Sequence, residues 1–304
     1  MEKIKSPATD HVVLENERSQ GVTKQVNELS TGKFFKYLYA KSMFKMFGLN
    51  LLMCLFLIPM VILYYRFTLQ SMSIANTIPY NGSLGIGFAF WKGASEYAVA
   101  TGNSLLSSFW LWAILGICAT SFAFAGGICV IRNAFWTGEL SVSKNFYKGI
   151  YQCGLVAFVG FALIGGAICG IVHLNFVMAD WSKFLAVVVN IVLIAATVFL
   201  AIFVFVLTSV ESTYRQPFGT SVKTSFAIIK KYFISTVLNF VMALIPIALV
   251  LWLINSALII IVIVLALMIG MYYIVLVWQT HMMKVFSIYH PVEKIVTKRK
   301  KHIN

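Results

Sequence analysis

The chain alternates between long apolar runs and short segments rich in lysine and arginine. Six runs of 18 to 27 residues contain no Asp, Glu, Lys or Arg; they are 48–65, 105–131, 153–178, 184–210, 233–254 and 257–280. A helix needs roughly 20 mostly apolar residues to cross the about 30 Å of hydrocarbon in a bilayer. The pattern therefore predicts an all-α fold, a polytopic transmembrane bundle of six helices.

The connections group the six predicted spans into three hairpins. Residues 179–183 join spans three and four, and two residues join spans five and six, whereas the first external connection, 66–104, is long. We expect a flexible cytoplasmic tail over 1–32, a membrane domain over 33–284 and a basic cytoplasmic tail over 285–304.

Segments rich in lysine and aromatic residues precede spans one, three and five, at 33–37, 144–148 and 230–233. Such residues favour the membrane–water interface. We therefore expect each hairpin to open with a short interfacial helix on the cytoplasmic side. Three related repeats would explain the recurrence, and so would the ordinary crowding of these residues at a cytoplasmic interface.

The charge distribution predicts the orientation. The net charge is +14, with 60% hydrophobic and only 11% charged residues, against about 25% charged in ordinary soluble domains. Of the 24 Lys and Arg residues, 21 fall on the side of the predicted bundle that holds both termini. By the positive-inside rule both termini are cytoplasmic, in a multi-pass protein of the plasma membrane. The basic residues then face anionic lipid head groups of the bilayer rather than nucleic acid.

A few polar and helix-breaking residues lie inside the apolar runs. Asn50 and Asn239 each precede a proline, Pro59 and Pro246, by seven to nine residues. Buried amides in membrane helices usually bond to a neighbouring helix, and proline tends to kink its helix. These four residues are therefore predicted to pack helices together, or alternatively to line a cavity.

Two glycines four residues apart, Gly166 and Gly170, lie in predicted span three. Small residues at this spacing let helix backbones approach closely. We expect them to contact another helix, either within the chain or in a second copy.

Charged residues recur close to the bilayer on two predicted cytoplasmic connections. Arg132 and Glu139 lie on one, and Glu211 and Arg215 on the other. We expect them to form an ion-pair clasp between hairpins, for example from Arg132 to Glu211, and a docking site is the alternative.

Catalytic and metal-binding patterns are not recognisable in the sequence. His173 is the one ionisable residue within the predicted spans, and the five cysteines have no metal-ligand spacing. We expect no cofactor, no metal and no enzymatic activity. An enzyme acting on a lipid-linked substrate would need a cluster drawn from His173, Asp180 and Glu96.

Three segments carry a likeness to a known family: 49–59 in span one, 126–151, and 214–231 before span five. In these segments the chain resembles the YesL-like family of bacterial integral membrane proteins. It departs from the family's pattern at 60–65, where a polar stretch is usual, and in the long connection 66–104. The resemblance implies a Gram-positive-type bacterial membrane protein of a family often associated with carbohydrate uptake, and it supplies no active site.

We therefore expect a non-enzymatic membrane protein that is accessory to a transport system, such as one for carbohydrate uptake, or to a cell-envelope system. Its expected partners are transporter subunits or a second copy of itself. The alternative is an autonomous small-solute carrier or channel lined by Asn50, Asn239, Pro59 and Pro246.

Overall fold

The fold of the chain is given by a computed structural model, which describes residues 44–63, 65, 94–137, 140–178, 182–214, 216–253, 264 and 270–289. Within these residues the regular structure is entirely helical, with no strand. The long helices are α4 (Ala94–Thr137), α5 (Val142–Val177), α6 (Lys183–Thr213), α7 (Phe218–Leu253) and α9 (Met271–Tyr289).

Four of these helices contain stretches that are long and apolar enough to cross a membrane. The stretches are Ala113–Phe135, Val142–Asn175, Lys183–Thr213 and Phe218–Leu249. They overlap predicted spans two to five, so the all-helical fold is confirmed for the described residues, and these four helices are consistent with a membrane bundle. Because α4 begins at Ala94, the end of the predicted external connection 66–104 is a helical extension of span two.

The predicted first and sixth spans are described less completely. The run 48–65 falls on the shorter apolar helix Phe44–Leu55, which ends in a turn at Phe56 and Leu57 before a further helical segment containing Pro59. The turn is expected here, because proline has no N–H to donate to the carbonyl four residues earlier. Half of the run 257–280 lies outside the described residues, and its last part forms the start of α9.

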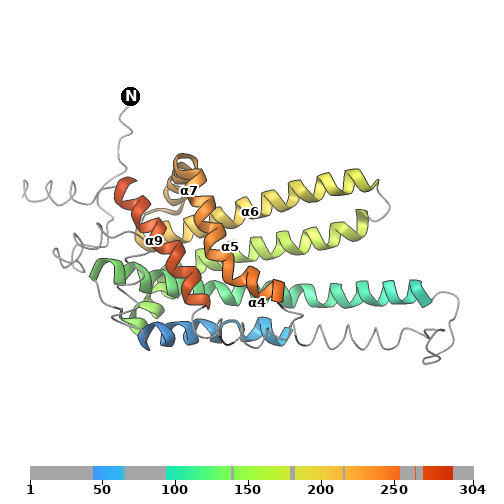
Figure 1. The fold of residues 1–304 in the computed structure, drawn as a ribbon, viewed down its shortest axis with the longest axis horizontal. Coiled ribbons are helices and arrows are strands. Elements are labelled where there is room, and N and C mark those ends of the chain that lie inside the picture. The colour runs from blue at the N-terminus through green and yellow to red at the C-terminus, as the bar shows by residue number, and fades with distance from the viewer. Residues whose placement is uncertain are drawn as a thin grey trace, which may run out of the picture.

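Helices α4, α5 and α6 lie side by side as three long rods, and α9 crosses them near one end (Figure 1). We call this end the packed end; there α4 and α6 terminate and α5 begins. Helix α4 is central, because 67% of the residues in the most apolar part of its stretch are buried, against 24%, 33% and 17% for α5, α6 and α7. Much of the surface of α5, α6 and α7 is therefore apolar and exposed, as expected for helices that face lipid.

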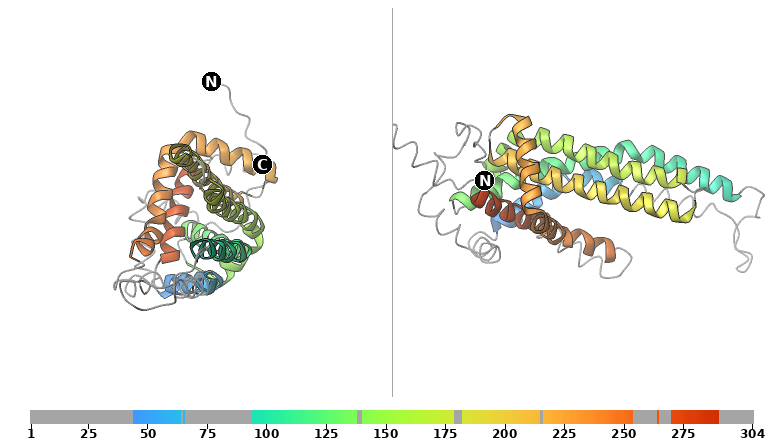
Figure 2. Two further views of the ribbon diagram at one scale, coloured as in Figure 1. Left: turned by 90° about the vertical axis from the view of Figure 1, so that its right-hand side faces the viewer. Right: turned by 90° about the horizontal axis from the view of Figure 1, so that it is seen from above.

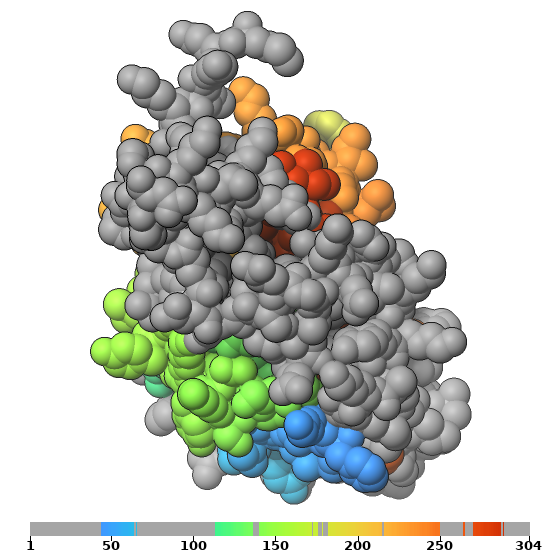
Figure 3. Space-filling model, turned by 90° about the vertical axis from the view of Figure 1, so that its left-hand side faces the viewer, coloured from blue at the N-terminus to red at the C-terminus, as the bar shows by residue number. Residues whose placement is uncertain are grey.

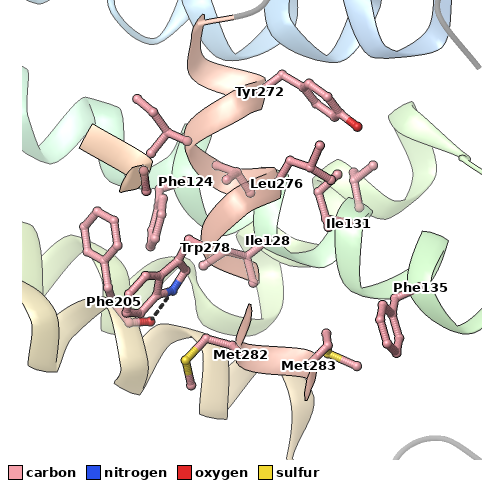
Figure 4. Packing of buried hydrophobic residues seen from close by; sticks show 14 of the residues in the cluster. Phe124, Ile128, Ile131, Phe135, Phe205, Tyr272, Leu276, Trp278, Met282 and Met283 are labelled. Carbon is pink, nitrogen blue, oxygen red and sulfur yellow. Dashed lines mark hydrogen bonds between the residues drawn. The ribbon is translucent and has the colours of Figure 1, made fainter. Parts of the chain in front are cut away.

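The main hydrophobic core lies at the packed end. Phe205 of α6 packs against Phe124 of α4 in a tilted arrangement, with ring centroids 4.1 Å apart, and meets Trp278 of α9 edge-on at 5.4 Å. Leu276 and Met283 of α9 lie toward α4 in the close-up of this core (Figure 4). Apolar packing thus joins α4, α6 and α9 at one level.

Helices α4 and α5 approach each other closely at Gly149. A Cβ built on Gly149 would lie 2.6 Å from the carbonyl oxygen of Ala125 and 2.6 Å from the Cβ of Cys129. The neighbouring side chain Phe146 is fully buried. This close packing explains why α5 runs without a break from Val142 to Val177, so that residues 144–148 do not form the separate interfacial helix that the sequence predicts.

The corresponding segment before predicted span five, 230–233, contains a kink. Tyr232 has non-helical dihedral angles, φ −120° and ψ 29°, within α7. The light-orange first part of α7 lies across the direction of α4, α5 and α6, and the second part turns away from it (Figure 2). Pro246 lies further along inside the helix, so the pronounced change of direction is at Tyr232.

We predict that Gly149→Ala destabilises the protein by about 1–3 kcal/mol, the usual cost of overpacking, because a backbone carbonyl blocks the added methyl group. Gly166→Ala is the matched control, since nothing lies within 4 Å of a Cβ built there. Its expected effect is neutral or a gain of up to about 1 kcal/mol from helix propensity. Thermal unfolding in mild detergent measures both, and equal losses would contradict the close α4–α5 contact.

Candidate functional site

Polar side chains gather inside the packed end, where they connect three helices. We call this group the polar clasp: Arg132 and Asn133 from α4, Ser209 and Ser212 from α6, and Trp278 from α9. All five side chains are buried. Because a buried polar group without a hydrogen bond is costly, their contacts decide how the helices fit together.

Arg132 lies near the end of α4 and is only 1% exposed. Its Nη1 donates to the backbone carbonyl of Ser212, in the last turn of α6. Its Nη2 also donates to Asn133 Oδ1 at 3.0 Å and to Cys129 Sγ at 3.2 Å. The last carbonyls of a helix have no partner within the helix, and the helix dipole favours a cation at this end. Arg132 therefore caps α6 from the side of α4.

Trp278 fastens α9 to the same end of α6. Its indole Nε1 donates to Ser209 Oγ at 3.0 Å and to the carbonyl oxygen of Phe205 at 3.3 Å. Figure 4 marks the second of these bonds. Ser212 Oγ in turn donates to the carbonyl of Ser209 at 2.8 Å. One turn of α6 thus receives hydrogen bonds from both α4 and α9.

Asn50 performs a similar task at the start of α9. The backbone N–H of Tyr272 donates to Asn50 Oδ1 at 2.8 Å, across 222 positions of sequence. The first N–H groups of a helix lack partners within it, so the amide oxygen of Asn50 acts as a cap supplied by another helix. Asn50 is fully buried, and its Nδ2 lies 3.7 Å from Cys54 Sγ.

The other residues of the predicted solute site lie elsewhere. Asn239 is half-buried and donates to the carbonyl of Ser235 in its own helix at 2.8 Å. Pro59 is exposed and Pro246 is half-buried. Asn50 therefore joins two helices, whereas Asn239 bonds within its own helix.

The structure describes two of the four residues of the predicted ion-pair clasp, Arg132 and Glu211. Glu211 is half-buried and directly precedes Ser212, so Arg132 reaches the segment of α6 in which its predicted partner lies. The described bond is to a backbone carbonyl, and the pairing of Arg132 with Glu211 stays a prediction. Glu139 and Arg215 lie outside the described residues.

Gly166 and Gly170 lie on the outward side of α5. Within the described part of the chain, nothing lies within 4 Å of a Cβ built at either position. The described residues therefore supply no close contact for this pair, and contact with another helix, in the rest of the chain or in a second copy, stays a prediction.

Two of the three residues considered for an enzyme, His173 and Glu96, lie away from the polar clasp. His173, near the end of α5, is exposed, and Glu96 lies in the first turn of α4, at the end of the rods opposite the packed end. Asp180 lies outside the described residues. Over the described ranges, no three residues among His, Cys, Asp and Glu are placed to hold a metal ion.

The sequence analysis missed a buried polar turn on α9. Gln279, Thr280 and His281 are at most 7% exposed. Among the described residues, however, both amide atoms of Gln279, Thr280 Oγ1 and His281 Nε2 find no hydrogen-bond partner. Burial lowers the pKa of His281 to about 4, with a smaller contribution from the nearby positive charge of Lys284. The sequence did carry a signal for this turn, because three consecutive polar residues, 279–281, stand at the end of the last apolar run.

Comparison of the chain with protein-family models, with curated proteins and with solved structures gives no match. The resemblance to the YesL-like family therefore stays a prediction.

We predict that Asn50→Leu destabilises the protein by about 1–3 kcal/mol, because the buried N–H of Tyr272 loses its acceptor. Asn239→Leu is the matched control, since it removes only a bond within one helix turn and its expected effect is close to zero. Thermal unfolding of both variants in the same detergent measures the difference. Similar melting temperatures for the two would show that Asn50 does not cap α9.

Proposed function

We propose that the protein is a six-span membrane protein of the plasma membrane with both termini in the cytoplasm. The distribution of basic residues over the described helices supports this orientation. Arg132, Lys144 and Lys148 lie toward the packed end on α4 and α5, and α7 carries three more lysines near its start. Lys183, at the start of α6, lies at the opposite end. By the positive-inside rule, the packed end faces the cytoplasm.

Within this membrane domain, the function that we propose is non-enzymatic, as an accessory to a transport or cell-envelope system. The observation that carries it is the use of the interior polar groups. Arg132 binds the end of α6, and Trp278 binds the last turns of the same helix. Asn50 binds the start of α9. Such contacts fix the helices relative to one another, which suits a scaffold that presents its outer faces to a partner.

The resemblance to the YesL-like family favours a bacterial protein associated with carbohydrate uptake. The expected partners are then the membrane subunits of a transporter, or a second copy of the chain. The outward glycines Gly166 and Gly170 provide a place on α5 where a partner helix could approach closely.

An autonomous small-solute carrier or channel is the second candidate. Its support comes from α9, where Gln279, Thr280 and His281 hold buried polar atoms without partners among the described residues. Buried polar groups in native proteins are usually satisfied by protein, water or ligand. The originally predicted lining by Asn50, Asn239, Pro59 and Pro246 has less support, because Asn50 caps α9 and Asn239 bonds within its own helix.

Affinity purification of the tagged protein from its native membrane in mild detergent, followed by mass spectrometry, tests the accessory role. We expect transporter or envelope subunits in stoichiometric amounts. Replacing both Gly166 and Gly170 by leucine should reduce this recovery while leaving the melting temperature unchanged, because both positions face outward. Recovery of the protein alone from wild-type membranes would contradict the accessory role and favour the carrier.

A further inference from the structure

The first part of α7 carries an exposed stripe of basic and aromatic side chains. We call Lys223, Phe226 and Lys230 the basic stripe; they are spaced by three and four residues and thus share one face of the helix. All three are exposed, Phe226 at 49%. On the opposite face, Ser221, Ser225 and Ile228 are fully buried against the bundle. The helix is therefore held on the protein with a fixed side turned outward.

The direction of this helix differs from that of the rods. In the view along the rods, the first part of α7 is seen lengthwise across them (Figure 2). If the rods cross a bilayer, this part lies near the membrane plane. The break at Tyr232 separates it from the apolar second part. A helix that lies along the membrane surface with lysines and large apolar side chains is typical of interfacial binding.

The charges carried by α5 and α7 themselves are of one sign, and the neighbouring acid Glu211 lies beside Ser221 on the buried side of α7. Neither α5 nor α7 contains an Asp or Glu residue along its whole length. The start of α5 adds exposed Lys144, Tyr147 and Tyr151 at the packed end. Residues of α5 in green and of α7 in orange reach the surface at this end (Figure 3). The complementary ligand is therefore anionic.

We propose that the basic stripe binds the phosphate groups of anionic phospholipids in the adjacent leaflet. A lysine ammonium group is a compact charge suited to phosphate, and aromatic rings settle at head-group depth. Phe226 is 49% exposed, and its ring packs on Phe203 of α6 with centroids 4.6 Å apart. Lys223 and Lys230 flank this anchored ring, so the two charges reach head groups on either side of it. The inference rests on the proposed membrane topology, and it is independent of the accessory role.

The test is lipid selectivity of the full-length protein, reconstituted in bilayers of equal parts phosphatidylcholine and phosphatidylglycerol. Electron spin resonance of spin-labelled lipids gives the association constant of phosphatidylglycerol relative to phosphatidylcholine. We expect the wild-type protein to prefer phosphatidylglycerol. Lys223→Gln and Lys230→Gln should each lower the relative association constant of phosphatidylglycerol about fivefold, and high salt should lower it too. The double variant Lys223→Arg/Lys230→Arg should keep the preference.

Lys183→Gln is the matched control. Lys183 is also exposed, but it lies at the opposite end of the rods, and the acidic Asp180 precedes it by three residues. We expect this variant to keep the wild-type selectivity. Unchanged selectivity in Lys223→Gln/Lys230→Gln, or an equal loss in Lys183→Gln, would overturn the proposal. Failure of the wild-type protein to enter bilayers would instead overturn the proposed topology, so the two failures are distinguishable.

Discussion

The bond from the Arg132 guanidinium to the Ser212 carbonyl is the contact on which the arrangement at the packed end depends. Helix ends leave backbone groups without partners, and an apolar bundle offers no bulk water to satisfy them. Here a side chain from another helix does so, Arg132 at the end of α6 and Asn50 at the start of α9. Since each such bond needs its two helices in one relative position, the caps fix the geometry that apolar packing alone would leave adjustable.

This arrangement gives the bundle two different ends. At the packed end, aromatic rings from α4, α6 and α9 interlock around Phe205, and the buried polar groups are concentrated there. Toward the other end, α5 and α6 expose residues such as Leu163, Val187 and Ile191. Lipid is a suitable neighbour for these apolar faces, and a charged residue such as Arg132 is most cheaply placed near the interface. Both the buried charge at the packed end and the exposed apolar surface of the rods fit a bundle whose packed end lies near one face of a bilayer.

The sequence predicted the parts of the fold that depend on composition along one helix. The charge-free runs located the apolar stretches of α4 to α7, because a bilayer sets both length and polarity. The sequence could not predict the contacts of Asn50 and Arg132. Their partners are a backbone N–H and a backbone carbonyl that are distant in sequence, and almost every residue type carries these groups. The continuous start of α5 was also missed, because it follows from the α4–α5 contact at Gly149. Likewise, the change of direction in α7 lies at Tyr232, while the sequence pointed to Pro246.

The central claim is that the rods cross a membrane with the packed end in the cytoplasm. Its most direct test is labelling of single cysteines, introduced at Lys144 and at Lys183 in a cysteine-free background, with a thiol reagent that does not cross membranes. The two positions are exposed and lie at opposite ends of the rods. We predict that position 183 reacts in intact cells and position 144 only after permeabilisation. The reverse pattern would contradict the orientation, and equal labelling of both in intact cells would contradict a membrane-spanning arrangement of α5 and α6.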